Sequence, residues 1–326
     1  RIAKCIGAKD KDEIIFTSGG SEANNLAMNI TPHVFTSNIE HHSILKCVRT
    51  PQQCLQADRE GLVSKDIVNR VISETSVYKP QIVSVMAVNN EVGTIQNIEE
   101  ISKICHDNGV MFHTDAVQGI GHIPINVSKM NIDMMSVSGH KIHAPKGIGF
   151  LYCTHANDVI KLSPIIKGGQ QENGFRAGTE NVAYIIGLAK AVEIACNEEL
   201  MENREFHTRK LRDKLLDNLC NRLDNIYVNG DMHNRIAGNL NISFKGVEAE
   251  SLMLMLDMHD IYVSSGSACN SKSIEPSHVL TAIGCKDPYS TIRISINEDN
   301  TEKEIEYIAD EIVTAVNVLR KANPNY

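Results

Sequence analysis

The chain has 326 residues, of which 42% are hydrophobic and 22% charged, as is ordinary for a globular protein large enough for two domains. Its formal net charge of −8 argues against a nucleic-acid or membrane-surface partner, because both of those surfaces repel an acidic protein. The sequence contains no apolar run long enough to cross a bilayer and begins with no recognisable signal peptide.

The nine cysteines favour a reducing compartment such as the cytoplasm. Their number is odd, their spacing is irregular, and none forms a Cys-x-x-Cys pair, so we expect free thiols rather than a disulfide framework. The pairs His41-His42 and His140-x-x-His143 have no thiolate or carboxylate ligands nearby at metal-site spacing. We therefore expect no metal centre.

Short apolar runs alternate with helical patterns through the first 200 residues. The predicted strands are residues 13–17, 33–37, 81–88, 110–114, 134–137 and 149–153, and the predicted helices are 22–28, 64–72, 98–108 and a short one at 117–119. Several strands are continuous apolar runs, as in a parallel sheet covered on both faces. This pattern predicts a large α/β domain over residues 1–197, with ligands at the carboxyl ends of the strands.

The remaining residues, 198–326, are predicted to form a smaller α+β domain that follows a long helical pattern at 180–223. Its strands are expected at 226–228, 238–244, 261–264 and 290–296, and its helices at 249–258 and 302–320. The chain lacks an initiating methionine, and residues 1–6 are typical of the end of an amphipathic helix. We therefore expect that a natural N-terminal segment is missing.

The first motif with chemical meaning is TSGGSE at residues 17–22, which joins a strand to a helix. Its small residues allow backbone N–H groups to approach an anion at the helix N-terminus, and Ser21 adds a hydroxyl. The motif therefore suits a phosphate cradle. A capped turn with Ser21 as the N-cap explains it about as well.

Polar motifs also follow the strands at 33–37 and 81–88. EHHS at 40–43 places a histidine that could stack on a ring or move protons, although a lone histidine is more often structural. VNNEVG at 88–93 places amide side chains at a strand tip, where they serve either a turn or a ligand site.

Asp115 and Lys141 each stand at the end of an apolar run, in HTDAVQ at 113–118 and SGHK at 138–141. A lysine beyond a buried strand can hold a carbonyl as a Schiff base, and an aspartate on a neighbouring strand can hold a pyridinium nitrogen. Those are the protein groups that pyridoxal 5'-phosphate (PLP) needs most. Taken singly, Lys141 could be a solvated loop lysine and Asp115 a helix cap.

Two later motifs are ambiguous when taken alone. The glycine-rich run at 168–180, which contains Arg176 and Thr179 and leads into a helix, suits either a phosphate contact or a simple loop. Arg293 lies in the alternating run STIRISI at 290–296, on the face opposite the isoleucines. It could clamp a carboxylate through two parallel hydrogen bonds or could be a surface arginine.

Cys269 lies in SSGSACNSK at 264–272, among small polar residues. Most cysteines pack as small buried hydrophobes, but this segment offers almost nothing apolar for a thiol to pack against. We therefore predict that Cys269 is a reactive, exposed thiol.

Together these motifs resemble those of cysteine desulfurases of the NifS/IscS type, which belong to the class V aminotransferase family and have the fold type I PLP-dependent transferase architecture. The resemblance covers nearly the whole chain in the family's order, and it is carried by TSGGSEANN, EHHSIL, VNNEVG, HTDAVQ, SGHKIHAPKGIG, RAGTEN and SSGSAC. The aspartate–lysine pair implies only a fold type I PLP enzyme, whereas the cysteine loop is the specific part.

The resemblance implies a role for each matching residue. Lys141 would hold PLP as a Schiff base and move protons, Asp115 would keep the pyridine nitrogen protonated, and His41 would stack on the ring and take part in acid–base steps. The remaining ligands would be Gln118 at the phenolic oxygen, and Gly20, Ser21, Ser138, His140 and the partner subunit's Thr179 at the phosphate.

The resemblance also implies the substrate, the reaction and the partners. Asn90 and Arg293 would hold the carboxylate of L-cysteine, and Cys269 would take its sulfur as a persulfide while L-alanine leaves. The expected assembly is a homodimer, and the expected sulfur acceptor is a U-type scaffold protein for iron–sulfur cluster assembly. Three alternatives remain: a selenocysteine lyase, a plain aminotransferase, and a non-catalytic subunit that lacks its N-terminal segment.

Overall fold

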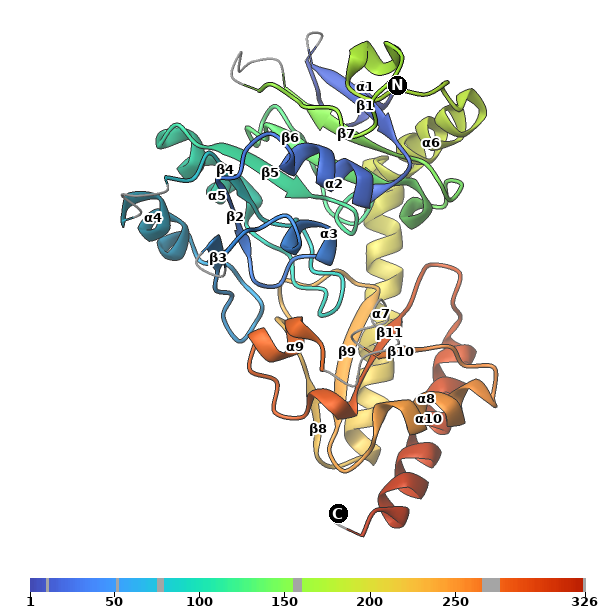
Figure 1. The fold of residues 1–326 in the computed structure, drawn as a ribbon. Coiled ribbons are helices and arrows are strands. Elements are labelled where there is room, and N and C mark those ends of the chain that lie inside the picture. Colours follow the sequence, from blue (N-terminus) through green and yellow to red (C-terminus); the bar gives the residue numbers. More distant parts are fainter. Residues whose placement is uncertain (10–11, 51–52, 75–78, 155–159, 266–275, 325–326) are drawn as a thin grey trace. The chain divides into compact units, whose positions relative to one another are not determined.

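The computed structural model describes residues 1–9, 12–50, 53–74, 79–154, 160–265 and 276–324, which form two compact units (Figure 1). The first unit contains residues 1–57, 63–89 and 95–201, and the second contains residues 58–62, 90–94 and 202–326. The boundary that the sequence predicts between residues 197 and 198 stays a prediction. The short segments 58–62 and 90–94 group with the second unit although they lie early in the chain.

The first unit is built on a seven-stranded sheet with the order β1-β7-β6-β5-β4-β2-β3. Only β7 runs antiparallel to its neighbours, so the prediction of a mainly parallel sheet is confirmed. The strands are β1 (Glu13–Thr17), β2 (Val34–Ser37), β3 (Cys54–Leu55), β4 (Ile82–Ser84), β5 (Met111–Asp115), β6 (Met134–Ser138) and β7 (Gly149–Cys153).

Helices cover both faces of this sheet, so its central strands β4, β5 and β6 are buried at every residue. One core joins alternate strand residues such as Phe112 and Val137 to α1 (Ile2–Cys5), α4 (Lys65–Glu74), α5 (Ile98–Asp107) and α6 (Val182–Ala195). The opposite core joins Met111 and Met134 to α2 (Gly20–Met28) and α3 (His42–Leu45). Asp115 is two and four residues from His113 and Met111 on β5, so its side chain faces α2.

The structure departs from the predicted elements at three places in this unit. The strand predicted at 81–88 is regular only over β4, although the backbone N–H groups of Val85 and Ala87 still donate to β5 carbonyls. Residues 117–119 form a turn rather than a helix. The helical pattern at 180–223 is divided in two because Asn197 accepts from the N–H of Leu200 and so begins α7 (Glu198–Arg222).

The second unit packs helices against a four-stranded antiparallel sheet with the order β10-β11-β9-β8. Its leucine and isoleucine core joins α7 to the buried faces of β9 and β11. The elements are β8 (Ile226–Val228), β9 (Asn239–Phe244), α8 (Ala249–Asp257), β10 (Ser264–Ser265), α9 (His278–Ala282), β11 (Thr291–Ser295) and α10 (Glu302–Ala322). Among the described residues, short 3-10 helices also occur as η2 (Gly139–Ile142), η3 (Gln171–Gly174) and η5 (Pro288–Ser290).

Within the described ranges, the structure contains no helix that is both long enough and apolar enough to cross a membrane.

Candidate functional site

The carboxyl ends of β5 and β6 bring several predicted residues together in the first unit. Asp115 ends β5, Ser138 ends β6, and the two strands pair in parallel with Asp115 opposite Ser136. His140 and Lys141 follow on η2, and Gly20 and Ser21 open α2. Helix α2 packs on the face of the sheet toward which Asp115 points (Figure 1). Because carboxyl ends of parallel strands meet at one edge, side chains far apart in sequence become neighbours there.

The glycine turn before α2 lies directly against β6 and the turn after β5. A Cβ atom on Gly19 would stand 3.6 Å from Ser138 Oγ, and one on Gly20 would stand 2.7 Å from Val117 Cγ2. Ser138 Oγ lies 3.0 Å from His140 Nδ1. Backbone N–H groups at a helix N-terminus and two polar side chains therefore converge, as a phosphate group requires.

The alternative interpretation of this turn, with Ser21 as N-cap, is wrong. The N-cap of α2 is Gly19, no side chain caps this helix, and Ser21 is an exposed residue inside the first turn. The Ser21 hydroxyl is therefore not engaged in N-capping α2.

Asp115 is almost fully buried and accepts two hydrogen bonds. Asn24 Nδ2 donates to its Oδ2 over 2.7 Å, and the backbone N–H of Val117 donates to its Oδ1 over 2.9 Å. Burial raises the pKa of Asp115, against the opposing effect of these two donors. Each carboxylate oxygen retains a lone pair, so Asp115 can still accept from a protonated ring nitrogen, and such a cation would stabilise its charge.

His41 forms the N-cap of α3 through its ring. The backbone N–H of Ser43 donates to His41 Nδ1 over 3.1 Å, and Ser43 Oγ lies 2.7 Å from the same nitrogen. Asn24 Nδ2 also donates to Ser43 Oγ over 2.9 Å. Asn24 and Ser43 thus connect the histidine to Asp115.

Sequence reasoning assigned no role to Asn24 or Ser43. The signal available for Asn24 was a polar residue on the helix face that Ala23, Leu26 and Ala27 bury. Its partners lie 19 and 91 residues away, and only the fold brings them together.

Glu40, directly before His41, is completely buried. Its Oε1 accepts from Ser37 Oγ over 2.6 Å and from the backbone N–H of Met86 over 2.8 Å. Burial raises the pKa of Glu40 to about 8, and the nearby charge of Asp115 acts in the same direction. A carboxyl with this pKa is mainly protonated at neutral pH.

Lys141 is exposed on η2, a tight turn that depends on Gly139. A Cβ atom on Gly139 would lie 3.0 Å from the backbone oxygen of Ile148 and from side chains on two other segments. Gln118 is half-buried on the turn after β5. Both side chains therefore project from turns that begin at the ends of adjacent strands.

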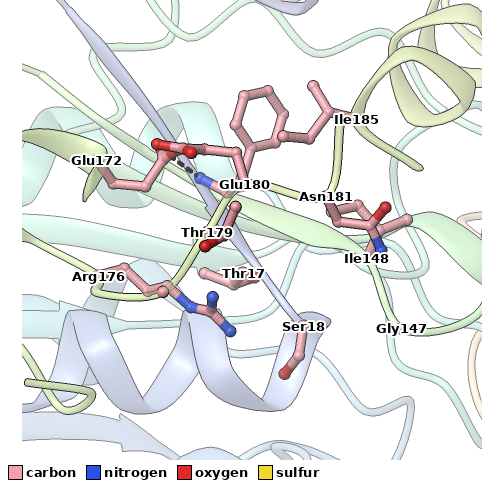
Figure 2. Close-up of a pocket in the computed structure, with 12 residues that line it drawn as sticks. Thr17, Ser18, Gly147, Ile148, Glu172, Arg176, Thr179, Glu180, Asn181 and Ile185 are labelled. Carbon is pink, nitrogen blue, oxygen red and sulfur yellow. Dashed lines mark hydrogen bonds between the residues drawn. The ribbon is translucent and has the colours of Figure 1, made fainter. Parts of the chain in front are cut away.

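Thr179 lines a pocket of about 150 Å³ in its own chain (Figure 2). The pocket is framed by Glu172, whose Oε2 accepts from the N–H of Phe16 over 2.9 Å, and by Arg176, whose Nε donates to Glu22 Oε1 over 2.9 Å. The other lining residues include Thr17, Ser18, Gly147, Ile148, Glu180, Asn181 and Ile185. Thr179 is exposed, and it lies in the first unit with the other predicted phosphate ligands.

The second unit holds the two predicted carboxylate ligands together. Arg293 Nη1 donates to the backbone oxygen of Asn90 over 2.8 Å. Arg293 Nε is buried and has no hydrogen-bond partner among the described residues. The guanidinium is therefore fixed at one nitrogen, while another remains available to an acceptor.

Cys269 lies outside the described residues, but residues on both sides of its segment are described. Ser264 on β10 pairs with Arg293 on β11. Ser277, the N-cap of α9, donates from its Oγ to Glu91 Oε2. Described residues that flank Cys269 in the sequence therefore lie beside Arg293 on one side and beside Glu91 on the other.

Glu91 is a second buried carboxyl that sequence reasoning did not identify. Burial raises its pKa to about 7, although the hydrogen bond from Ser277 and the charge of Arg293 lower it. Its backbone oxygen accepts from Asn239 Nδ2 and Asn241 Nδ2, both over 3.1 Å. These contacts hold segment 90–94 in the second unit.

Comparisons with known proteins match nearly the whole chain. A family model described as aminotransferase class-V matches residues 1–308. "Cysteine desulfurase IscS" of Dictyoglomus turgidum is 41% identical over 99% of this chain and 84% of the relative. The X-ray structure of a NifS-like protein from Rickettsia africae is 30% identical, with a TM-score of 0.87 over 97% of this chain and 86% of that one. "SspA in complex with cysteine" is 34% identical, with a TM-score of 0.72 over 90% of this chain and 84% of that one.

Proposed function

This chain belongs to the class V aminotransferase family, and we propose that it is a cysteine desulfurase, which takes the sulfur of L-cysteine and releases L-alanine. The relatives with this name match the chain over almost its full length. They do not favour a selenocysteine lyase, a plain aminotransferase or a non-catalytic subunit. The observation that carries the proposal is this match, and the convergence of Asp115, His41 and the glycine turn near the ends of β5 and β6 supports the PLP chemistry that a desulfurase needs.

The residues present fit PLP. Gly19 and Gly20 occupy positions where the turn closes on Ser138 and Val117, and the N-terminus of α2 lacks a side-chain cap. Asp115 is buried with acceptor capacity to spare. Enzymes of this family are generally PLP-dependent, and the bound cofactor supplies an electron sink that weakens bonds to the substrate carbon atoms.

In this proposal each residue of the first unit has a defined task. Lys141 would hold the cofactor and move a proton, Asp115 would keep the ring nitrogen protonated, and His41 would contact the ring and exchange protons. Gln118 would donate to the phenolic oxygen. The phosphate ligands are Gly20, Ser21, Ser138, His140 and Thr179, the last supplied to the site of the partner subunit.

The substrate carboxylate is assigned to Asn90 and Arg293. The buried Arg293 Nε without a partner among the described residues supports this assignment, because a carboxylate would satisfy it. The Cys269 thiolate attacks the substrate sulfur, so a sulfur–sulfur bond forms as the carbon–sulfur bond breaks. The carbon keeps the bonding electron pair and takes a proton, which yields alanine.

We further infer a homodimer with a U-type iron–sulfur scaffold protein as the sulfur acceptor. Apolar side chains on α6 support the dimer, since Val182 and Ile186 are 65% and 54% exposed just after Thr179. A cytoplasmic location agrees with the eight described cysteines, all of which are free thiols.

The decisive experiment is to measure alanine and sulfide released from L-cysteine by the purified protein with PLP and a thiol reductant. We expect the two products in equal amounts. Absence of alanine from a preparation that binds PLP would contradict the proposal. Faster turnover of selenocysteine than of cysteine would instead favour the lyase.

A further inference from the structure

A chain of hydrogen bonds runs through the first unit from Asp115 to His41. Asn24 Nδ2 donates to Asp115 Oδ2 over 2.7 Å and to Ser43 Oγ over 2.9 Å, and Ser43 Oγ lies 2.7 Å from His41 Nδ1. Asn24 is 1% exposed, so water cannot replace these bonds without rearrangement. Three segments of the chain, α2, β5 and the start of α3, are thereby tied together.

The direction of each bond follows from the chemistry of the groups. An amide nitrogen carries two hydrogens, and Asn24 uses one for Asp115 and the other for Ser43. Its Oδ1 is buried and has no hydrogen-bond partner among the described residues. The reverse orientation of the amide would place that oxygen against the Asp115 carboxylate, which is unfavourable, so the carboxylate fixes the amide.

The donors around Nδ1 also fix the tautomer of the His41 ring. The backbone N–H of Ser43 can only donate, and it donates to His41 Nδ1 over 3.1 Å. Because Nδ1 accepts there, the 2.7 Å contact requires the Ser43 hydroxyl to donate to the same nitrogen, while its oxygen accepts from Asn24. Nδ1 must therefore be unprotonated, and in the neutral ring the hydrogen lies on Nε2.

We propose that Asn24 is a positioning residue, which acts through Ser43 to hold the neutral His41 ring as its Nε2–H tautomer while it orients Asp115. The tautomer of His41 and the orientation of Asp115 follow from the hydrogen bonds alone, and only the part that these two groups take in catalysis rests on the proposed function. The neutral His41 ring then carries its exchangeable hydrogen on Nε2. Asp115 Oδ2 is held by the hydrogen bond from Asn24 on α2. Asn24 acts only through Ser43 and Asp115 and contacts neither substrate nor cofactor in this role.

The tautomer is tested directly by ¹⁵N NMR of histidine-labelled full-length protein, before and after PLP is added. The His41 signals are identified among the 13 histidines by their loss in His41→Gln. We expect an unprotonated Nδ1 and a protonated Nε2. A protonated Nδ1 in the neutral ring would overturn the proposal.

The relay is tested with variants that remove one donor each. Asn24→Leu keeps the shape of the side chain but removes both N–H groups, and Ser43→Ala removes the hydroxyl, which Ser43→Thr retains. We expect Asn24→Leu and Ser43→Ala to shift the His41 Nδ1 resonance in the same direction, and Ser43→Thr to restore it. Asn29→Leu, at the exposed C-cap of the same helix, is the matched control.

PLP affinity supplies the second measurement. Asn24→Leu removes a donor that lowers the pKa of Asp115, so we expect roughly tenfold weaker PLP binding by that variant. A merely structural role would lower the melting temperature and leave the Nδ1 resonance unchanged, and that result would refute the proposal. Neither measurement depends on turnover, so a protein that forms no alanine but shows these shifts would refute only the desulfurase function.

Discussion

The two regions that carry the predicted chemistry are built in different ways. In the first unit, Asp115, Asn24 and His41 are held by direct hydrogen bonds between strand ends and helices. In the second, Arg293 and Glu91 lie at the two ends of the segment that contains Cys269. A cofactor must be held in one geometry, whereas a sulfur carrier must reach both a donor and an acceptor. The first region suits fixed positioning, and the second anchors the described residues that flank Cys269 in the sequence.

The sharpest test of this contrast compares Lys141→Ala with Cys269→Ser. Both should reduce alanine formation by at least roughly 1,000-fold, because each removes a group that takes part in bond making. Only Lys141→Ala should abolish the stable visible absorption of bound PLP. Cys220→Ser, at an exposed free cysteine on α7, should leave both activity and absorption unchanged. Loss of PLP from Cys269→Ser would show that cofactor binding and sulfur transfer are not divided between the two regions.

Glu40 should make the stability of the protein depend on pH. Its pKa is raised from about 4.5 to about 8 in the folded state, so its stabilising contribution is complete below pH 4.5 and is lost as pH rises through 8. In Glu40→Gln, the fall in the free energy of unfolding between pH 5 and pH 8 should be smaller by about 3 kcal/mol. Urea unfolding at pH 5 and pH 8 measures the difference. The exposed Glu99→Gln is the control, and an equal decline in wild type and Glu40→Gln would exclude Glu40 as its source.

Glu91 should make the stability of the second region fall with rising pH, over a narrower pH range than Glu40. Its pKa of about 7 places the loss of stability between pH 4.5 and pH 7. In Glu91→Gln, the fall in the free energy of unfolding between pH 4.5 and pH 7 should be smaller by about 2 kcal/mol. Hydrogen exchange of the α9 amides at pH 5 and pH 7.5 reports this locally, since Ser277 caps that helix. Exchange that is independent of pH in wild type, after correction for the intrinsic rate, would argue against this role.

Arg293→Lys should have the smallest effect. Lysine keeps the charge but lacks the planar fork, so we expect the KM for L-cysteine to rise about tenfold while kcat changes little. Arg222→Lys, which retains a surface pairing with Asp310, is the matched control. A fall in kcat with no change in KM would mean that Arg293 does not bind the substrate carboxylate.

The sequence pattern predicts the sheet of the first unit well, because β7 is almost wholly apolar and β5 and β6 each begin with two apolar residues. It fails at residues 117–119, where the backbone turns after Asp115, and at Asn197, whose side chain begins a new helix. Motifs place Asp115, Lys141 and Arg293 at strand ends. They do not reveal Asn24 or Glu91, because the partners of these two residues are set by tertiary structure rather than by local pattern.

The chain passes between the two units five times, since segments 58–62 and 90–94 belong to the second unit. This interleaving has a practical consequence for dissecting the protein. A fragment that starts at residue 202 would leave Asn239 and Asn241 without the Glu91 carbonyl to which both donate, and Arg293 without that of Asn90. The second unit is therefore a discontinuous domain, and it cannot be excised from the gene as one intact piece.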